Sequence, residues 1–352
     1  MNKRLFIWIG LLFALLACNM GTSAPTRTSN LFATLSASTP LSANSVSTMN
    51  PAQAATSVFL STPIPSTMTV PTSLSIDQPT GKIVFTCQIF KVQASNQVCI
   101  INADGTGLRR LTTDENKQHY YPTISPDGKS VVYAAFREAN IYEIYEMNIA
   151  TGSVVQLTNR LGNLNAPEIS PDGKSIIFKV WSANTNKNVI WMMDRDGQNA
   201  DKVSRVVGWD PTWSPDGKYV LFASDMDGAI QLFRMGVNGK ELHRVSNLPA
   251  IRGRSDWSPD GQFIVTYSGE PWKHEVYIMN VDGSNARILS PAGGNSQGPS
   301  FSPDGQWVTF TSYFDNYGDD HGCEIYIMRV DGTDLRRLTD NDYCDYQPRW
   351  GP

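Results

Sequence analysis

The fold is decided by a stretch that reads Pro211-Thr212-Trp213-Ser214-Pro215-Asp216-Gly217-Lys218, followed by the apolar run Tyr219-Val220-Leu221-Phe222. Its Ser-Pro-Asp-Gly core occurs five times, beginning at Ser125, Ser170, Ser214, Ser258 and Ser302. The successive spacings are 45, 44, 44 and 44 residues. Self-similarity with such a period is typical of propellers and other repeat folds, so the chain from residue 81 onward is one repeated unit.

A sixth unit is split between the two ends of the repeat region. Gly81-Lys82-Ile83-Val84-Phe85 reproduces the segment that follows the motif, and Pro348-Arg349-Trp350 reproduces the segment that precedes it. The C-terminal segment therefore completes the unit that begins near residue 81. This arrangement predicts a ring that is closed by pairing the last strand with the first.

Each unit is predicted to contain four strands joined by tight turns. Ser-Pro-Asp-Gly joins strands one and two, because proline presets φ and glycine accepts a positive φ. A second turn joins strands three and four, at Asp104-Gly105, Thr151-Gly152, Asp196-Gly197, Asn238-Gly239, Asp282-Gly283 and Asp331-Gly332. Aspartates that recur at the same turn of successive repeats are predicted to be structural rather than catalytic or metal-binding.

Six such units predict an all-β fold, a six-bladed β-propeller over residues 81–352, which leaves only short, protected edges. Proline opens the predicted first strand at Pro122, Pro167, Pro211, Pro299 and Pro348, as suits an edge strand that faces a central channel. Large side chains are predicted to pack between blades at Ile124, Ile169, Trp213, Trp257, Phe301 and Trp350.

The pattern Pro-x-Trp-Ser-Pro-Asp-Gly-Lys, followed by Ile-Tyr-x-Met-Asn-x-Asp-Gly and Arg-x-Leu-Thr, resembles the TolB-type propeller repeat, a WD-like family. The resemblance covers residues 81–352. It implies a periplasmic or surface protein used in protein or ligand binding. It does not identify the ligand, because sites are grafted onto folds independently.

The N-terminus has the features of an export signal. Met1 to Arg4 are basic, and Leu5 to Ala17 form an uncharged apolar run too short to span a bilayer. Leu15-Leu16-Ala17-Cys18 resembles the bacterial lipobox. We therefore expect a lipoprotein signal peptide at residues 1–17 and lipidation of Cys18. The mature protein would be anchored to a membrane of the cell envelope, outside the cytoplasm; ordinary secretion and an uncleaved anchor are the alternatives.

Residues 18–80 are predicted to form a disordered stalk. Ser, Thr, Ala and Pro make up 38 of the 62 residues from 19 to 80, a composition that buries too little apolar surface to offset backbone ordering. A small β-domain is the alternative. The formal net charge of −4 argues against a nucleic-acid partner.

Four cysteines remain after Cys18. In an exported chain an even number predicts disulfides. Cys87 ends strand two and Cys99 begins strand three of the same blade, while Cys323 begins strand three of the last blade and Cys344 lies before the closing strand. These positions predict the pairs Cys87–Cys99 and Cys323–Cys344, with free thiols as the alternative.

Enzyme signatures are weak. Gly294-Asn295-Ser296-Gln297-Gly298 matches Gly-x-Ser-x-Gly, but it lies in a loop between blades, without the strand-to-helix elbow that gives the pattern meaning. A metal-dependent polysaccharide lyase would use histidines of one face, where His119, His274 and His321 are expected on three different blades. The acidic run from Asp315 to Asp320 lacks an EF-hand pattern. We expect no catalytic residue, metal or cofactor, and keep a lyase or hydrolase as the alternative.

Binding is expected on the face opposite the Ser-Pro-Asp-Gly turns, because its loops vary in length and chemistry. This face is predicted to gather aromatic and arginine side chains of the kind that dominate binding hot spots: Tyr120, Trp209, Arg254, Trp272, Tyr313 and Tyr346. The sequence thus predicts a monomeric, lipid-anchored, non-catalytic module that binds an envelope protein, peptide or glycan.

Overall fold

A computed structural model describes residues 78–90, 94–138, 141–182, 185–314 and 322–352. The predicted signal peptide, Cys18 and the stalk up to residue 77 lie outside the described residues, as do the acidic run from Asp315 to Asp320 and His321. The described part of the chain contains no helix that is long and apolar enough to cross a membrane.

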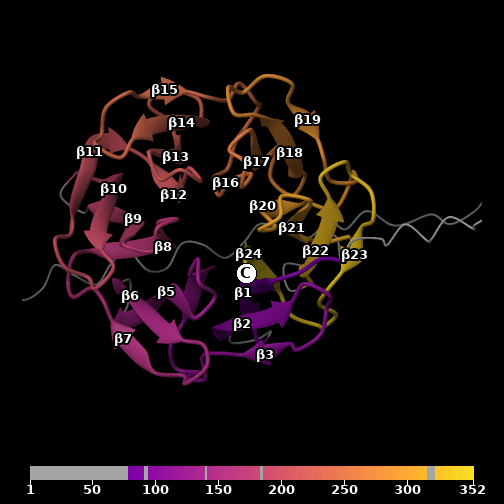
Figure 1. Ribbon diagram of the computed structural model, residues 1–352, viewed down its shortest axis with the longest axis horizontal. Helices are drawn as coiled ribbons and strands as arrows, with labels where there is room; N and C mark the ends of the chain where they lie inside the picture. The colour runs from indigo at the N-terminus through magenta and orange to yellow at the C-terminus, as the bar shows by residue number, and fades with distance from the viewer. Residues whose placement is uncertain (1–77, 91–93, 139–140, 183–184, 315–321) are drawn as a thin grey trace, which may run out of the picture. The chain divides into compact units, whose positions relative to one another are not determined.

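Six antiparallel sheets of four strands each surround a common axis (Figure 1). Within each blade, the first strand named is the one nearest the axis. Blade 1 contains β24 (Asp345–Gly351), β1 (Lys82–Gln88), β2 (Asn96–Asn102) and β3 (Arg109–Arg110). Blade 2 contains β4 (His119–Ile124), β5 (Ser130–Glu138), β6 (Ile141–Asn148) and β7 (Val154–Gln156). Blade 3 contains β8 (Asn163–Ile169), β9 (Ser175–Ser182), β10 (Lys187–Asp194) and β11 (Asp201–Val207).

Blade 4 contains β12 (Trp209–Trp213), β13 (Tyr219–Ser224), β14 (Gln231–Gly236) and β15 (His243–Arg244). Blade 5 contains β16 (Asp256–Trp257), β17 (Phe263–Ser268), β18 (Glu275–Asn280) and β19 (Arg287–Ile288). Blade 6 contains β20 (Gln297–Phe301), β21 (Trp307–Ser312), β22 (Glu324–Arg329) and β23 (Arg336–Arg337). The predicted all-β, six-bladed propeller is confirmed.

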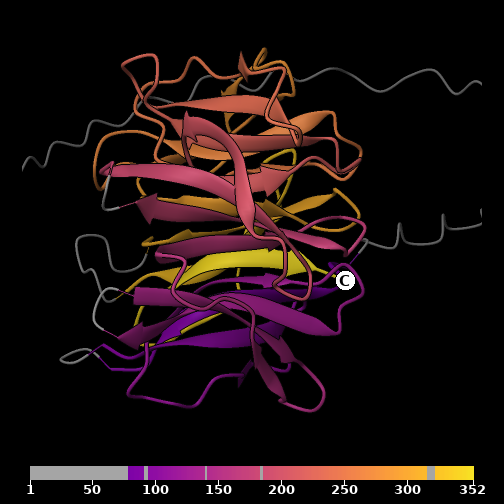
Figure 2. The ribbon, with the colours of Figure 1, turned by 90° about the vertical axis from the view of Figure 1, so that its left-hand side faces the viewer.

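The ring is closed by the split blade. Strand β24 pairs antiparallel with β1, so that Trp350 lies opposite Ile83 and Gly351 lies opposite Lys82. In Figure 2 the yellow C-terminal strand lies beside the indigo strands that begin the propeller. The closure predicted from the two half-motifs is therefore confirmed.

Apolar side chains fill the spaces between neighbouring blades. Ile124 of blade 2 packs with Val84 and Ile100 of blade 1, and Trp350 of blade 1 packs with Trp307 of blade 6. All six large residues predicted at this position are at most 7% exposed. Burying a side chain of this size contributes about 1.5–3 kcal/mol, so these contacts hold successive blades together.

The recurrent turns are stabilised by their own polar side chains. In the first turn Gly128 N–H donates to the Ser125 carbonyl at 2.8 Å, and Gly128 has a φ of +69°. Ser125 Oγ donates to Asp127 Oδ1 at 2.6 Å and accepts from Ser130 N–H at 2.9 Å. The serine hydrogen bond lowers the pKa of Asp127. These contacts give Asp127 a structural role in its turn, as predicted.

The prolines of the first strands lie inside those strands rather than opening them, which corrects the prediction. Strand β4 begins at His119, and its register against β5 shifts between Tyr120 and Thr123, around Pro122. Similar shifts occur in β8, β12, β20 and β24. Each is a β-bulge, which suits a proline because the bulge leaves a residue unpaired, and which re-aims the neighbouring side chain.

Both predicted disulfides are present. Cys87 is bonded to Cys99, with a Cα–Cα distance of 5.8 Å, and Cys323 is bonded to Cys344, with a Cα–Cα distance of 4.4 Å. The second bond ties β22 to the segment that enters the closing strand β24.

Candidate functional site

The innermost strands place two layers of homologous side chains along the channel. Residues two positions before the turn serine form the first layer, which we call the inner ring: Thr123, Glu168, Thr212, Asp256, Ser300 and Arg349. Residues four positions before it form the second layer, which we call the mouth ring: Tyr121, Ala166, Asp210, Arg254, Gly298 and Gln347. Five mouth-ring residues have a φ between +49° and +59°, and only Arg254 lacks this conformation. The bulges therefore turn this position out of the regular strand alternation.

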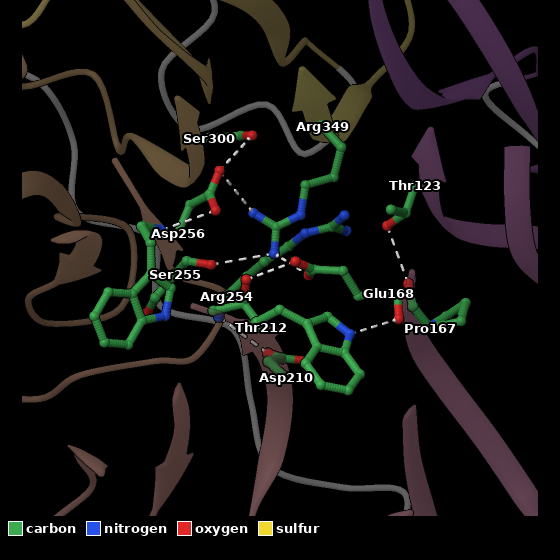
Figure 3. A network of polar contacts seen from close by, with 12 residues as sticks. Thr123, Pro167, Glu168, Asp210, Thr212, Arg254, Ser255, Asp256, Ser300 and Arg349 are labelled. Carbon is green, nitrogen blue, oxygen red and sulfur yellow. Dashed lines mark hydrogen bonds and ion pairs between the residues drawn. The ribbon is translucent and has the colours of Figure 1, made fainter. Parts of the chain in front are cut away.

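Arg349 crosses the inner ring (Figure 3). Its Nη2 donates to Glu168 Oε2 at 2.8 Å and to the Ser255 carbonyl at 3.1 Å, and its Nη1 lies 3.5 Å from Asp256 Oδ2. Thr212 donates to Glu168 at 2.6 Å. The arginine thus ties blade 1 to blades 3 and 5 across the channel.

Burial dominates the electrostatics of this ring. It raises the pKa of Glu168 above its ordinary value, although Arg349 acts in the opposite direction. Burial likewise opposes the charge on Arg349, but Glu168 and Asp256 outweigh it and raise the pKa of the guanidinium. The ring therefore depends on Arg349 to balance two enclosed carboxyl groups.

Arg254 forms a second brace at the mouth ring. Its Nη2 donates to the Pro122 carbonyl of blade 2 at 3.1 Å, on the opposite side of the six-membered ring. Its backbone N–H donates to Asp210 Oδ2 at 3.1 Å, and its guanidinium lies 5.7 Å from the centre of the Tyr121 ring. Burial and the neighbouring Arg349 lower the pKa of Arg254 to about 9.

A cavity of about 420 Å³ opens where these side chains meet. Its volume falls within the range of about 300–1,000 Å³ that is typical of ligand sites. The lining contains four tyrosines, three glutamines and one charged residue of each sign: Gln88, Tyr121, Asp210, Arg254, Tyr267, Gln297, Gly298, Thr311, Tyr313, Cys344, Tyr346 and Gln347. The lining includes the mouth-ring residues Tyr121, Asp210, Arg254, Gly298 and Gln347 but no inner-ring residue, so the pocket lies at the mouth ring.

The polar groups of the pocket are adapted to hydrogen bonding rather than to strong charge. Burial raises the pKa of Tyr121, Tyr267 and Tyr346, so their hydroxyl groups stay protonated at neutral pH. Burial also raises the pKa of Asp210, against the opposing effect of Arg254. The pocket can therefore offer hydroxyl, amide, carboxyl and guanidinium groups to one ligand.

Three of the six residues predicted from sequence line this pocket, namely Arg254, Tyr313 and Tyr346. Trp272 is 45% exposed and meets Tyr313 edge to face, with 5.7 Å between ring centres. Trp272 thus contacts the pocket lining through Tyr313.

The other two lie at the edges of the same region. Tyr120 and Tyr346 are joined through Asn96, whose Nδ2 donates to Tyr120 Oη at 2.9 Å and whose Oδ1 accepts from Tyr346 Oη at 2.8 Å. Trp209 lies next to Gly253, directly before Arg254. Whether these residues bind a ligand remains a prediction.

Sequence reasoning missed most of the pocket lining and the whole inner ring as a network. The signal was present, because the positions two and four residues before the turn serine vary in chemistry while their neighbours repeat. Alignment of the six units would have gathered the charged members Glu168, Asp210, Asp256 and Arg349 beside Arg254. The contacts of these residues across the channel depend on the closed ring and could not be read from one unit.

Of the enzyme-signature residues, Ser296 donates its backbone N–H to the His274 carbonyl at 2.8 Å, and no hydrogen bond joins their side chains in the described structure. The hydroxyl group of Ser296 lies 3.2 Å from that of Ser312, and neither ring nitrogen of His274 has a hydrogen-bond partner in the described structure. His119 is buried against Tyr133, and burial lowers its pKa to about 4. Within the ranges that the structure covers, no three His, Cys, Asp or Glu side chains cluster as metal ligands do.

Comparison with known proteins assigns the family. The family model described as the TolB beta propeller domain matches residues 79–318. The chain belongs to this family. A crystal structure of TolB from Acinetobacter baumannii superimposes on the TolB-type propeller with a TM-score of 0.68 and 26% identity, covering 78% of this chain and 68% of that one.

Two curated relatives share part of the TolB-type propeller. The Tol-Pal system protein TolB of Bordetella pertussis is 29% identical over 153 residues, which are 43% of this chain and 34% of that protein. An uncharacterised protein of Agrobacterium fabrum is 29% identical over 157 residues, which are 41% of this chain and 52% of that protein. The match thus spans between 34% and 52% of these relatives' length.

Proposed function

We propose that this protein is an exported, lipid-anchored and non-catalytic binding module, whose pocket and surrounding loop face receive a protein, peptide or glycan of the cell envelope. The observation that carries the proposal is the pocket at the channel mouth, which is lined by aromatic, amide and charged side chains from several blades. Concave sites of this composition on a rigid scaffold are typical of ligand binding.

Three observations support a location outside the cytoplasm. A TolB-family relative is named as a protein of the Tol-Pal system. Two disulfides are formed, and disulfides persist in oxidising compartments such as the bacterial periplasm. The segment that ends at Cys18 resembles a lipoprotein signal. We propose the same boundaries as above: signal peptide 1–17, stalk 18–80 and propeller 81–352.

The alternative function is a propeller enzyme, either a metal-dependent polysaccharide lyase or a hydrolase. It would use the loop face, on which His119 and His274 are predicted from sequence. A hydrolase and lyase screen of the purified protein tests it, because turnover that is abolished by changing either histidine would overturn the non-catalytic proposal.

The binding face is tested by pull-down from solubilised envelope with the full chain as bait. Trp209→Ala and Arg254→Ala are expected to weaken capture of the partner, each by about 1 kcal/mol or more, as at an interface hot spot. Because Arg254 also braces the channel, binding by the Arg254→Ala variant is measured at a temperature at which its melting curve shows that it is folded. Lys174→Ala is the control, since its side chain is exposed beside a Ser-Pro-Asp-Gly turn on the opposite face. Loss of binding in the Lys174 variant, with normal binding by the other two, would place the site on the turn face.

A further inference from the structure

We propose that the pocket receives the terminal carboxylate of a partner polypeptide, with Arg254 supplying the positive charge and Thr311 and Gln88 supplying hydrogen bonds. This inference rests on the proposed function and names the chemical group that the site takes.

The walls of the pocket hold unpaired hydrogen-bonding groups. Within the described residues, Arg254 Nη1, Thr311 Oγ1 and Gln88 Oε1 are buried and have no hydrogen-bond partner, and all three residues line the pocket. Buried polar atoms are nearly always paired, so three unpaired ones on residues that line one pocket require an explanation. A bound ligand provides it.

The three unpaired atoms differ in their hydrogen-bonding chemistry. A guanidinium nitrogen is a charged donor, a hydroxyl group donates or accepts, and an amide oxygen accepts. A carboxylate next to a peptide N–H matches this set, because the carboxylate accepts from Arg254 and Thr311 while the N–H donates to Gln88. Charge-assisted hydrogen bonds of this kind are shorter and stronger than neutral ones.

A ligand carboxylate must reach these buried atoms and approach Asp210. Arg254 is 6% exposed and Thr311 is 3% exposed, so modest side-chain rotation is needed to present the unpaired atoms to a ligand. Such rotamer changes are common on binding. Asp210 lies in the same lining, and its raised pKa weakens its repulsion of an incoming carboxylate.

The charge of Arg254 favours a polypeptide over a neutral glycan. The hydroxyl groups of a neutral glycan carry no charge, whereas every polypeptide with a free C-terminus carries a carboxylate that can accept a charge-assisted hydrogen bond from Arg254. The exposed indole of Trp272 meets Tyr313 at the rim. It offers contact to the chain that leads into the pocket.

The test uses the full-length protein and two matched peptide pools. One pool contains N-acetylated tripeptides without Asp or Glu and with free C-terminal carboxylates; the other contains the same peptides with amidated ends. After incubation and ultrafiltration, retained peptides are measured by mass spectrometry. The free acids are expected to be retained at least tenfold more than the amides. Equal retention of the two pools, or retention of neither, would overturn the proposal.

Two further probes separate other sources of an anion. An amidated pool with one internal glutamate tests a side-chain carboxylate, and oligogalacturonate tests an acidic glycan. Stronger retention of either probe than of the free-acid pool would overturn the assignment to a polypeptide terminus. If the free-acid pool is not retained while Trp209→Ala still weakens capture of an envelope partner, the carboxylate assignment is wrong and the proposed function stands.

Variants of the chain complete the test. Arg254→Gln is expected to reduce retention of the free acids at least tenfold, whereas Arg252→Gln, a matched change at a side chain that donates to the Gly269 carbonyl, should not. Thr311→Val removes a hydroxyl group without a partner in the described structure, so folding should be preserved while retention falls severalfold. Unchanged retention in Thr311→Val, together with unchanged retention in Arg254→Gln or failure of that variant to fold, would contradict the proposal.

Discussion

Replacing Arg349 by methionine should strongly destabilise the propeller. The guanidinium is buried and contacts Glu168, Asp256 and the Ser255 carbonyl, so the change leaves two enclosed carboxyl groups without their cation. Breaking a buried ion pair by removing one partner costs about 3–5 kcal/mol. A stability change of 1 kcal/mol shifts the melting temperature by about 2–4 °C in domains of 150–250 residues. The melting temperature of Arg349→Met should therefore fall by roughly 6–20 °C.

The loss should depend on pH and on Glu168. The pKa of Glu168 is already raised by burial, and removing Arg349 raises it further, so the folded variant binds a proton that the unfolded chain has released. The stabilisation that this proton gives the folded variant is therefore complete below the ordinary Glu168 pKa of 4.5 and is lost as pH rises above that value. Urea unfolding followed by tryptophan fluorescence at pH 5 and at pH 8 measures this difference. Glu168→Gln combined with Arg349→Met should recover part of the loss at pH 8. A single-variant loss below about 1 kcal/mol at both pH values would refute the cross-channel brace.

Two other predictions concern the closing seam. Burial and the neighbouring Glu324 raise the pKa of Asp345 to about 7, so the folded state retains a proton between about pH 4 and pH 7 and stability should fall, on the order of 4 kcal/mol, as pH rises through that window. Asp345→Asn should flatten this slope in urea titrations, and an unchanged slope would show that other groups cause it. Replacing Cys323 and Cys344 together by alanine opens a bond that spans 21 residues and should cost about 3 kcal/mol; calorimetry that finds no loss would mean that the bond does not secure the seam.

The architecture could be predicted from the sequence because each repeat contains the residues that determine its own turns and its contact with the next blade. The turn at Ser214 to Gly217 needs only a proline, an aspartate that accepts backbone hydrogen bonds and a glycine with positive φ. The inter-blade position at Trp213 is equally clear, since a large apolar residue recurs directly before each turn or at the equivalent closing position. The disulfides follow from the order of the strands.

The site could be predicted only in part. Aromatic and arginine residues of the loop face can be found by type, and three of the six predicted residues, Arg254, Tyr313 and Tyr346, line the pocket. No residue type in the sequence was used to predict the bulges. They place the prolines inside the first strands rather than at their starts, and they bring Asp210 and Gln347 to the channel mouth. The pairing of Arg254 with the Pro122 carbonyl joins opposite blades, so it follows from ring closure rather than from any local pattern.

Hydrogen–deuterium exchange of the full chain, with and without the partner captured from envelope, tests the central claim most directly. The binding proposal predicts slower exchange in residues 294–298 and 343–347, which border the pocket, with no change in the Ser-Pro-Asp-Gly turns at 125–128 and 214–217. Protection confined to those turns, with unchanged exchange around the pocket, would contradict the assignment of the binding site.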